Sequence, residues 1–328
     1  MSARAWAAFA GVSMFWGMPY LLIKVAVDDS LPPVFVTWVR VVLGAVVLLV
    51  LARRRGVLGT LRGRLRWLIV IALVEITLPF TLIAVGEQHV SSSLAAVVIA
   101  AAPTFVVLLA LRFDPSERAG GLRLAGLALG LGGVAASVGV DVAGSLDELL
   151  GGAAILSAAG CYAIGPMVFK RHLADLDPRA SMGASLTIAA LLLTPLVVIT
   201  PPASAPSLAA GGALLALGLF CTAAALLLYG LLIVEAGAGR ALVVTYVNPL
   251  VALALGMAIL GERPGVEAVI GFPLILAGSW LATRSQRPRR SRAGAIELRG
   301  AVAERTKTRP TLRPHWSATR AWATSRLG

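Results

Sequence analysis

Two charged side chains stand inside long apolar stretches, where each is a candidate for chemistry. Arg40 lies about seven residues into the apolar run 34–52, and Glu75 lies about nine residues into the run 67–86. If these runs cross a membrane, each unpaired charge costs at least about 2.5–3.5 kcal/mol at the helix centre. Counted from opposite faces of a roughly 30 Å core, their levels differ by roughly 8 Å, which the two side chains can span. We therefore expect either an ion pair that locks the two segments together or a substrate or proton site that lines a cavity.

Two prolines are the second signal. Pro103 and Pro249 lie at corresponding places in the fourth and ninth apolar runs. Each proline removes a backbone donor and frees a carbonyl one turn earlier. Paired breaks of this kind point to a binding region, and ordinary kinks are the alternative because proline is common in membrane helices. Next to Pro249, Asn248 offers an amide, and Tyr246 offers a ring and a hydroxyl.

Aromatic residues form the third group. Trp16 and Tyr162 lie deep within their runs at matching positions, so we expect them to line a cavity. Tyr20 and Trp38 are closer to the ends of their runs, where such residues usually anchor a helix at the membrane interface. A cavity with these rings would suit amino-acid-like or amphipathic organic solutes.

Signatures of other chemistry are absent from the sequence. It contains no HExxH, GxSxG or P-loop pattern, so neither a hydrolase nor an ATP-driven pump is suggested. His89 and His172 fall at the edges of apolar runs, and Cys161 and Cys221 lack metal-ligand spacing. We expect no metal, no cofactor and no catalytic residue.

Composition and periodicity predict an all-α membrane protein. Hydrophobic residues make up 58% of the chain and charged residues 14%, with a mean hydropathy of +0.86, whereas soluble domains carry about 25% charged residues. Most of the ten apolar runs reach the roughly 17–25 residues that a spanning helix needs. These runs are 5–26, 34–52, 67–86, 90–111, 121–140, 149–169, 180–200, 208–234, 241–260 and 265–284.

The chain repeats itself after about 146 residues. At that offset Trp16 matches Tyr162, Lys24 matches Lys170, Pro32 matches Pro178 and Pro103 matches Pro249. At an offset of 145, Glu117, Gly126 and Gly133 match Glu262, Gly271 and Gly278. Since each copy holds an odd number of spans, the second copy must be inverted in the membrane. We expect two five-helix repeats, at 5–140 and 149–284.

The distribution of Lys and Arg predicts the orientation. The breaks at 53–66, 112–123, 170–179 and 235–240, together with Arg4, hold 14 basic residues, and the other breaks hold two. This bias predicts that both termini lie in the cytoplasm. We also expect the protein to lie in the inner membrane of a bacterial cell. Lys24 is one of the two exceptions, and we expect it to pair with Asp28.

The C-terminal segment 285–328 supplies most of the net charge of +13. It lacks apolar periodicity, so we expect a disordered cytoplasmic tail that touches anionic lipid and binds no specific nucleic acid.

Within the fifth run, the Gly126-x3-Gly130 pattern predicts close packing between helices.

Several of these motifs occur in one order that resembles a known family. They are Phe15-Trp16-Gly17, Arg40 within Thr37-Trp38-Val39-Arg40, Ser91–Ala96 followed by Pro103, Ala241 to Asn248-Pro249, and the two Glu…Gly…Gly patterns given above. The set is similar to EamA-type transporters of the drug/metabolite transporter superfamily. That resemblance implies a ten-helix permease with two inverted EamA-like repeats. One departure is Leu186, which stands where the first repeat has Arg40.

The expected function is secondary-active export of a small metabolite, amino-acid-like or drug-like solute, by alternating access through a cavity between the repeats. A non-transporting scaffold, a channel or an intramembrane enzyme is the alternative. Expected partners are a small-molecule substrate and membrane lipids, with a homodimer left open. The candidate cavity residues are Trp16, Arg40, Glu75, Pro103, Tyr162, Tyr246, Asn248 and Pro249.

Overall fold

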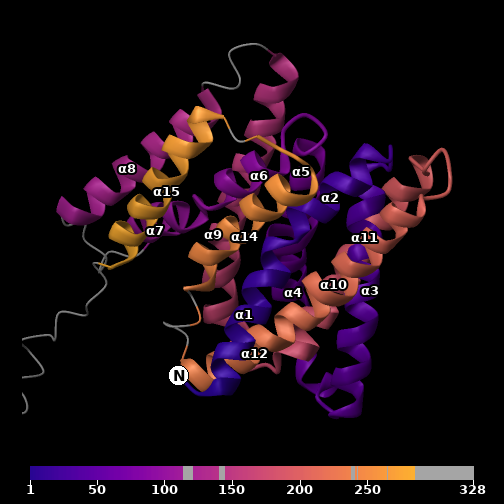
Figure 1. Cartoon of the computed structure of the whole chain (residues 1–328). Helices are drawn as coiled ribbons and strands as arrows, with labels where there is room; N and C mark the ends of the chain where they lie inside the picture. Colours follow the sequence, from indigo (N-terminus) through magenta and orange to yellow (C-terminus); the bar gives the residue numbers. More distant parts are fainter. Residues whose placement is uncertain (114–120, 140–144, 238–240, 242, 264, 285–328) are drawn as a thin grey trace, which may run out of the picture. The chain divides into compact units, whose positions relative to one another are not determined.

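The computed structural model describes residues 1–113, 121–139, 145–237, 241, 243–263 and 265–284, without the side chains of 110–113, 123, 137–139, 266–268 and 282–284. Throughout these ranges the secondary structure is helical (Figure 1). Glu117 and the predicted tail 285–328 lie outside the described residues.

The described helices of the first repeat form five spans, three of which consist of consecutive segments. They are α1 (Ala3–Gly17) with α2 (Pro19–Asp28), α3 (Pro33–Arg54), α4 (Leu65–Ile71) with η2 (Ala72–Thr77) and α5 (Leu78–Gly86), α6 (Ser92–Ile99) with α7 (Ala102–Phe113), and α8 (Gly121–Gly139). A short 3-10 turn, η1 (Leu58–Leu61), lies between α3 and α4.

The second repeat has the same order of spans within the described ranges. They are α9 (Leu146–His172), α10 (Pro178–Ile199), α11 (Leu208–Gly218) with η4 (Leu219–Ala224) and α12 (Ala225–Ala236), α14 (Val244–Ile259), and α15 (Val266–Arg284). Seven of the described helices are long and apolar enough to cross a membrane, and the apolar parts of α8, α14 and α15 are shorter. The apolar runs thus predicted the helices to within a few residues.

Contacts between the two repeats follow one pattern. Three pairs join corresponding spans, namely α3 with α10, α6 with α14, and α8 with α15. The first span of each repeat packs against the third span of the other, as α1 does with α12 and α9 with α5. Two related five-helix halves therefore build one membrane domain.

The two repeats run in opposite directions. Lys24, near the end of α2, donates from Nζ to the backbone carbonyl of Glu87 at 3.0 Å. Gly86, next to Glu87, lies against Gly151 in the first turns of α9. The end of the first span of one repeat therefore meets the beginning of the first span of the other, which confirms the inversion.

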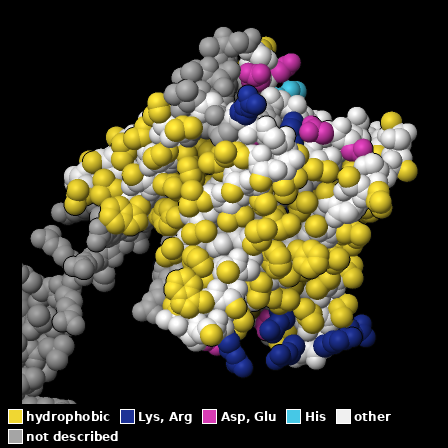
Figure 2. Space-filling view, in the orientation of Figure 1, with side chains coloured by type: hydrophobic (Ala, Val, Ile, Leu, Met, Phe, Trp, Pro, Cys, Tyr) yellow, Lys and Arg dark blue, Asp and Glu magenta, His cyan; other side chains and the backbone are white. Residues whose placement is uncertain are grey.

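Charged side chains gather at two opposite ends of the domain (Figure 2). Lys and Arg predominate at one end, and most of the visible Asp and Glu lie at the other. The basic end, as we call it, carries Arg53 and Arg54 in the last turn of α3 and Lys170 and Arg171 in the last turn of α9. The opposite, acidic end carries Asp147 and Glu148 in the first turn of α9, together with Asp28 and Asp29. The predicted Lys24–Asp28 pair is confirmed at 3.0 Å at this end.

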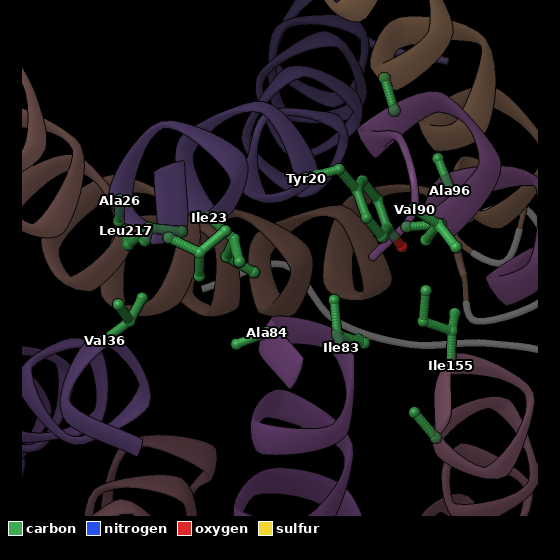
Figure 3. Close-up of a cluster of buried hydrophobic side chains, with 14 of the residues drawn as sticks. Tyr20, Ile23, Ala26, Val36, Ile83, Ala84, Val90, Ala96, Ile155 and Leu217 are labelled. Carbon is green, nitrogen blue, oxygen red and sulfur yellow. The ribbon is translucent and has the colours of Figure 1, made fainter. Parts of the chain in front are cut away.

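A main apolar cluster lies between the spans near the acidic end. Tyr20 of α2 is buried there among the side chains of Ile83, Val90 and Ala96 (Figure 3). The expectation that Tyr20 anchors a helix at the membrane interface is therefore wrong. The position near Lys24 suggested an exposed helix end, but α3, α5 and α6 pack over this part of α2.

Glycine permits the closest approach between the repeats. A Cβ atom on Gly278 of α15 would collide with the backbone of Gly130 and the carbonyl of Gly126 in α8. A Cβ atom on Gly133 would lie 2.8 Å from the backbone nitrogen of Ile275. The predicted glycine contact is therefore confirmed, and its partner is α15.

Candidate solute-binding site

Arg40 is buried in α3, where 6% of its surface remains exposed. Its Nε donates to Oγ1 of Thr222 in η4 at 3.0 Å, and its guanidinium carbon lies 3.8 Å from the ring centroid of Phe80. The Thr222 hydroxyl donates its own proton to the carbonyl of Leu217 at 2.8 Å, which leaves a lone pair for Arg40. This guanidinium is thereby held across the interface between the two repeats.

Glu75 is turned away from Arg40, and the predicted ion pair between them is absent within the described residues. Its carboxyl occupies space against Gly165 of α9, where a Cβ atom would collide with Oε2. Oε2 is buried and has no hydrogen-bond partner among the described residues. The expected depths of Arg40 and Glu75 in the membrane were compatible with an ion pair, but the two side chains contact different helices.

Both of these polar positions involve a π-helical segment. Glu75 lies in η2 (Ala72–Thr77), and Thr222 lies in η4 (Leu219–Ala224). These two segments occupy equivalent places in the third span of each repeat. π-Helical turns within α-helices are rare and occur frequently at functional sites. A shared irregularity in both repeats therefore marks this level of the membrane.

Two tyrosines act electrostatically on the Arg40 guanidinium. Tyr20 and Tyr162 are within electrostatic range of Arg40, and Tyr162 is also within range of Glu75. Tyr162 packs at the edge of the main apolar cluster, and Cys161 is within range of Glu75. Tyr162 is therefore the predicted residue that the structure brings close to both charges.

Trp16 belongs to a different group of side chains. Its ring packs against Tyr229 of α12 in a tilted arrangement, with centroids 4.8 Å apart and an interplanar angle of 46°. The surrounding cluster includes Val12, Leu232 and Val244, where α1 packs against α12 and α14. Trp16 thus contributes to the packing of the two repeats.

The two prolines differ in their effect on the backbone. The fourth span is interrupted between α6 and α7, and Pro103 is the second residue of α7, where its missing N–H breaks no helical hydrogen bond. Pro249 lies inside α14, which continues through it from Val244 to Ile259. The prediction of paired breaks is therefore wrong for the ninth span, whose proline is buried inside a continuous helix.

Asn248 and Tyr246 lie on the same helix as Pro249. The Asn248 side-chain oxygen is buried and has no hydrogen-bond partner among the described residues. Its backbone carbonyl lies where a Cβ atom on Gly17 would approach within 3.0 Å, so α14 packs closely on α1. Tyr246 is half-buried on the same helix. These residues flank the α1–α14 contact, and no described contact joins them to Arg40.

A carboxylate links the repeats at the acidic end. Glu262 accepts hydrogen bonds from the backbone N–H groups of Ser92 at 2.8 Å and Ser93 at 3.0 Å, and from the Ser93 hydroxyl. These N–H groups open helix α6, so the carboxylate also meets the positive end of the helix dipole. The contact ties α6 of the first repeat to the residues that follow α14 of the second.

Glu87 is a further buried acid beside this contact. The residue is fully buried, and both carboxyl oxygens lack a hydrogen-bond partner among the described residues. Burial raises the pKa of this carboxyl well above its ordinary value, and the Lys24 ammonium opposes the rise. Proximity to Glu262 raises the pKa further. The Arg40 guanidinium also opposes the rise in this pKa.

Two adjoining cavities lie toward the basic end, between α3, α10 and α12. Their volumes are about 510 Å³ and about 320 Å³. Leu227, Leu231 and Arg179 line both cavities. The larger cavity also meets Arg54, and the smaller one also meets Leu48. Leu48 lies two helical turns beyond Arg40 in α3, about 12 Å along the axis.

The described residues hold no group of three or more His, Cys, Asp or Glu side chains that could bind a metal ion. Cys161 and Cys221 are both free, and Cys221 is buried. The contacts that the structure shows around Arg40 are a hydrogen bond to Thr222 and a contact with the Phe80 ring.

Comparison with known proteins identifies the family. The model of the EamA-like transporter family matches residues 4–139 and again residues 149–284. The chain belongs to the EamA-like transporter family. As a member of that family it is an integral membrane transporter that carries a small molecule, and it is not an enzyme.

Curated relatives of this EamA-like transporter match it over most of their length. Protein PagO of Salmonella typhimurium is 29% identical over 277 residues, which is 83% of this chain and 90% of the relative. The inner membrane transporter YedA of Escherichia coli K12, of uncharacterized function, is 29% identical over 78% of this chain and 82% of its own. A probable terminal-alkyne amino-acid exporter of Streptantibioticus cattleyicolor is 29% identical over 89% of this chain and 97% of its own.

A solved crystal structure has the same fold. It superposes with a TM-score of 0.62 at 21% sequence identity and covers 87% of this chain and 99% of its own. At that identity the likeness concerns the fold alone, and it agrees with the ten-helix arrangement of this EamA-like transporter.

Several residues of the site were not predicted from the sequence. Thr222, Phe80 and Glu87 carry little signal by themselves, because a threonine, a phenylalanine and a helix-end glutamate are common in membrane proteins. Aligning the third spans of the repeats would have paired Glu75 with Thr222 and so marked Thr222. Glu262 was singled out only as part of a repeated Glu…Gly…Gly pattern.

Proposed function

We propose that this transporter exports a small amino-acid-like solute and that Arg40 binds the solute's carboxylate. The observation that carries the proposal is a buried guanidinium with Thr222 as its one hydrogen-bond partner among the described residues. Buried charges in proteins are normally paired. An arginine has several N–H donors in a planar fork that fits a carboxylate with two parallel hydrogen bonds. Glu87 acts on Arg40 electrostatically, but no acid forms an ion pair with it among the described residues, so a solute carboxylate would supply a direct counter-charge.

The aromatic surroundings favour a solute with an organic side chain. Phe80 lies on the face of the guanidinium, and Tyr20 and Tyr162 lie within electrostatic range of it. The relative from Streptantibioticus cattleyicolor is named for an unsaturated amino acid. An α-amino acid with an apolar side chain combines the carboxylate that Arg40 needs with a body that suits these rings. Other metabolites and drug-like carboxylates form the wider class.

Alternating access is supported by the difference between the two ends. At the acidic end, Glu262 ties the repeats together through Ser92 and Ser93. At the basic end, cavities lie along α3 and α12 to within two turns of Arg40. This arrangement fits a conformation that is closed at the acidic end and hollowed at the basic end. Rocking of the inverted repeats about Arg40 would exchange the two states.

The location that we propose is the inner membrane of a bacterial cell, with both termini in the cytoplasm. The concentration of Arg and Lys at the basic end supports this orientation, because basic loops stay cytoplasmic. YedA, the relative from Escherichia coli, is named as an inner membrane protein. The cavities would then open toward the cytoplasm, where an exporter loads its solute.

Flux in reconstituted vesicles tests the proposal. L-propargylglycine, a terminal-alkyne amino acid, is the probe, and its alkyne allows detection after coupling to a dye. Wild-type vesicles should exchange it across the membrane well above protein-free vesicles. Arg40→Leu should remove that flux, and Arg40→Lys should keep part of it because the positive charge remains. Arg62→Leu is the matched control, since Arg62 is exposed in the loop after α3.

Two outcomes would overturn the proposal. One is a wild-type flux equal to that of protein-free vesicles, as a non-transporting scaffold would give. The other is normal flux in Arg40→Leu with normal amounts of folded protein, because the carboxylate would then bind elsewhere.

A further inference from the structure

We propose that Glu75 is a proton-binding site through which inward proton movement drives solute export. This inference rests on the proposed export function and names its coupling ion. In each cycle the Glu75 carboxylate would take up a proton from the external side and release it to the cytoplasm. The solute would move in the opposite direction.

The first observation is the environment of the Glu75 carboxyl. It lies against the bare backbone of Gly165, and its Oε2 is buried with no hydrogen-bond partner among the described residues. The spans packed against η2 are α4, α5, α9 and α10. From these, the titratable groups within electrostatic range of Glu75 are Cys161 and Tyr162, and neither is a cation at neutral pH. An ionised Glu75 would therefore have no positive neighbour in the described part of the chain.

The second observation comes from the repeat. Glu75 and Thr222 are equivalent residues, and so are Leu186 and Arg40. The contact between Arg40 and Thr222 thus has a counterpart between α10 and η2, where Leu186 packs in one cluster with Ala72 and Ile76. In one half of the molecule an arginine meets a hydroxyl. In the other half leucine stands at the position of Arg40 and packs against the segment that carries Glu75, so that segment receives no cation from α10.

The third observation is a set of unsatisfied polar groups along the same span. Buried side-chain oxygens without a hydrogen-bond partner in the described residues belong to Glu75, Thr77, Thr81 and Glu87. They extend from the level of η2 to the acidic end of the span, which is the external end under the proposed orientation. Hydroxyl and protonated carboxyl groups can each accept and donate a hydrogen bond. The third span therefore carries buried hydrogen-bonding groups between Glu75 and the external side.

The proton site and the solute site share a neighbour. Tyr162 lies within electrostatic range of both Glu75 and Arg40. A change in the charge of Glu75 thus acts in the same buried region that holds the guanidinium. The site for the solute carboxylate lies at Arg40, so Tyr162 is the shared neighbour through which the two sites would influence each other.

Accumulation driven by a pH gradient tests the coupling. With one pH unit across the vesicle membrane, wild-type protein should accumulate L-propargylglycine about tenfold for each proton exchanged. A trapped pH dye should report the accompanying proton movement. Glu75→Gln and Leu186→Arg should each lose both signals, because one removes the titrating group and the other gives it a fixed cation. Leu186→Met, which keeps an apolar side chain of similar volume, should behave as wild type.

Chemical labelling gives a second test that needs no transport. Dicyclohexylcarbodiimide modifies protonated carboxyls in apolar surroundings, and peptide mass mapping locates the adduct. In detergent, wild-type protein should be labelled at Glu75 increasingly as the pH falls, and Leu186→Arg should be protected. If wild type shows no flux but Glu75 is labelled in this way, the export proposal fails and the proton site stands. Absence of labelling at Glu75, or gradient-driven accumulation by Glu75→Gln, would overturn the proton site.

Discussion

Glu75 and Thr222 stand at equivalent places in the two halves of the molecule. Each is the fourth residue of a π-helical segment, Ala72–Thr77 in one repeat and Leu219–Ala224 in the other. Thr222 accepts a hydrogen bond from Arg40, whereas the Glu75 carboxyl lies against Gly165. The same π-helical segment thus binds the Arg40 guanidinium in the second repeat and carries an isolated carboxyl in the first.

Thr222 should be necessary for holding Arg40. Thr222→Val keeps the shape of the side chain but leaves a buried Nε–H without its acceptor, which costs about 1–3 kcal/mol. The midpoint of unfolding in detergent should fall accordingly. Thr187→Val is the control, because Thr187 bonds only to the carbonyl of Gly183 in its own helix. Equal midpoints for the two variants would show that the Arg40 contact adds nothing to stability.

Gly165 should be necessary for the place of Glu75. A Cβ atom there collides with the carboxyl, so Gly165→Ala must displace Glu75 or move α9. We expect lower folded yield and lower flux. Gly160→Ala is a matched change in the same helix, where a Cβ atom would meet nothing within 4 Å. That control should be neutral or stabilising by up to about 1 kcal/mol, since alanine favours helix more than glycine does. Similar losses in both variants would contradict the assigned position of Glu75.

The α8–α15 contact should tolerate no side chain at Gly278. Gly278→Ala pushes against the backbone of Gly130 and should separate the two helices. Gly132→Ala, one of the open positions in α8, is the control because its Cβ atom meets nothing within 4 Å. Size-exclusion profiles and thermal unfolding in detergent measure the difference. An unchanged unfolding temperature for Gly278→Ala would refute the close packing described for these helices.

Glu262 should protect the first amides of α6 from exchange with solvent. Glu262→Ala removes the acceptor of the Ser92 and Ser93 N–H groups, so hydrogen exchange at these two amides should become faster. Ser91→Ala is the control, because the Ser91 hydroxyl accepts only from the Leu94 amide in the same turn. Mass-spectrometric exchange of the 88–96 peptide reads out both variants. Unchanged exchange at Ser92 and Ser93 would mean that the link between the repeats does not persist in the membrane domain.

Hydropathy and repeated residues predicted the architecture well, for physical reasons. A spanning helix needs a long apolar run whatever its neighbours are, so span limits such as 34–52 fell close to Pro33–Arg54. Matched prolines and lysines then revealed the repeat, and an odd number of spans implied its inversion. Lys24 with Asp28 was predictable because both lie one turn apart on one helix.

The partners of the buried charges could not be predicted in the same way. Position along an apolar run gives the depth of a side chain, but not the direction in which it leaves the helix. The π-helical segment at Glu75 changes that direction locally and carries no simple sequence pattern. Arg40 and Glu75 were therefore placed at compatible depths, yet they face different helices. Pro249 shows a related limit, since its helix accommodates a proline that was expected to break it.

Recognition of a carboxylate by Arg40 is tested most directly by comparing two ligands that differ only in their carboxylate. Binding of L-propargylglycine and of its amide, which lacks the carboxylate, can be measured by calorimetry on purified protein in detergent. Hydrogen bonds to charged groups are worth about 1.5–3 kcal/mol, so wild type should prefer the acid by about tenfold or more. Arg40→Leu should bind both ligands with similar weak affinity, and Arg40→Lys should keep part of the preference. Equal affinities in the wild type, or an undiminished preference for the acid in Arg40→Leu, would contradict the account.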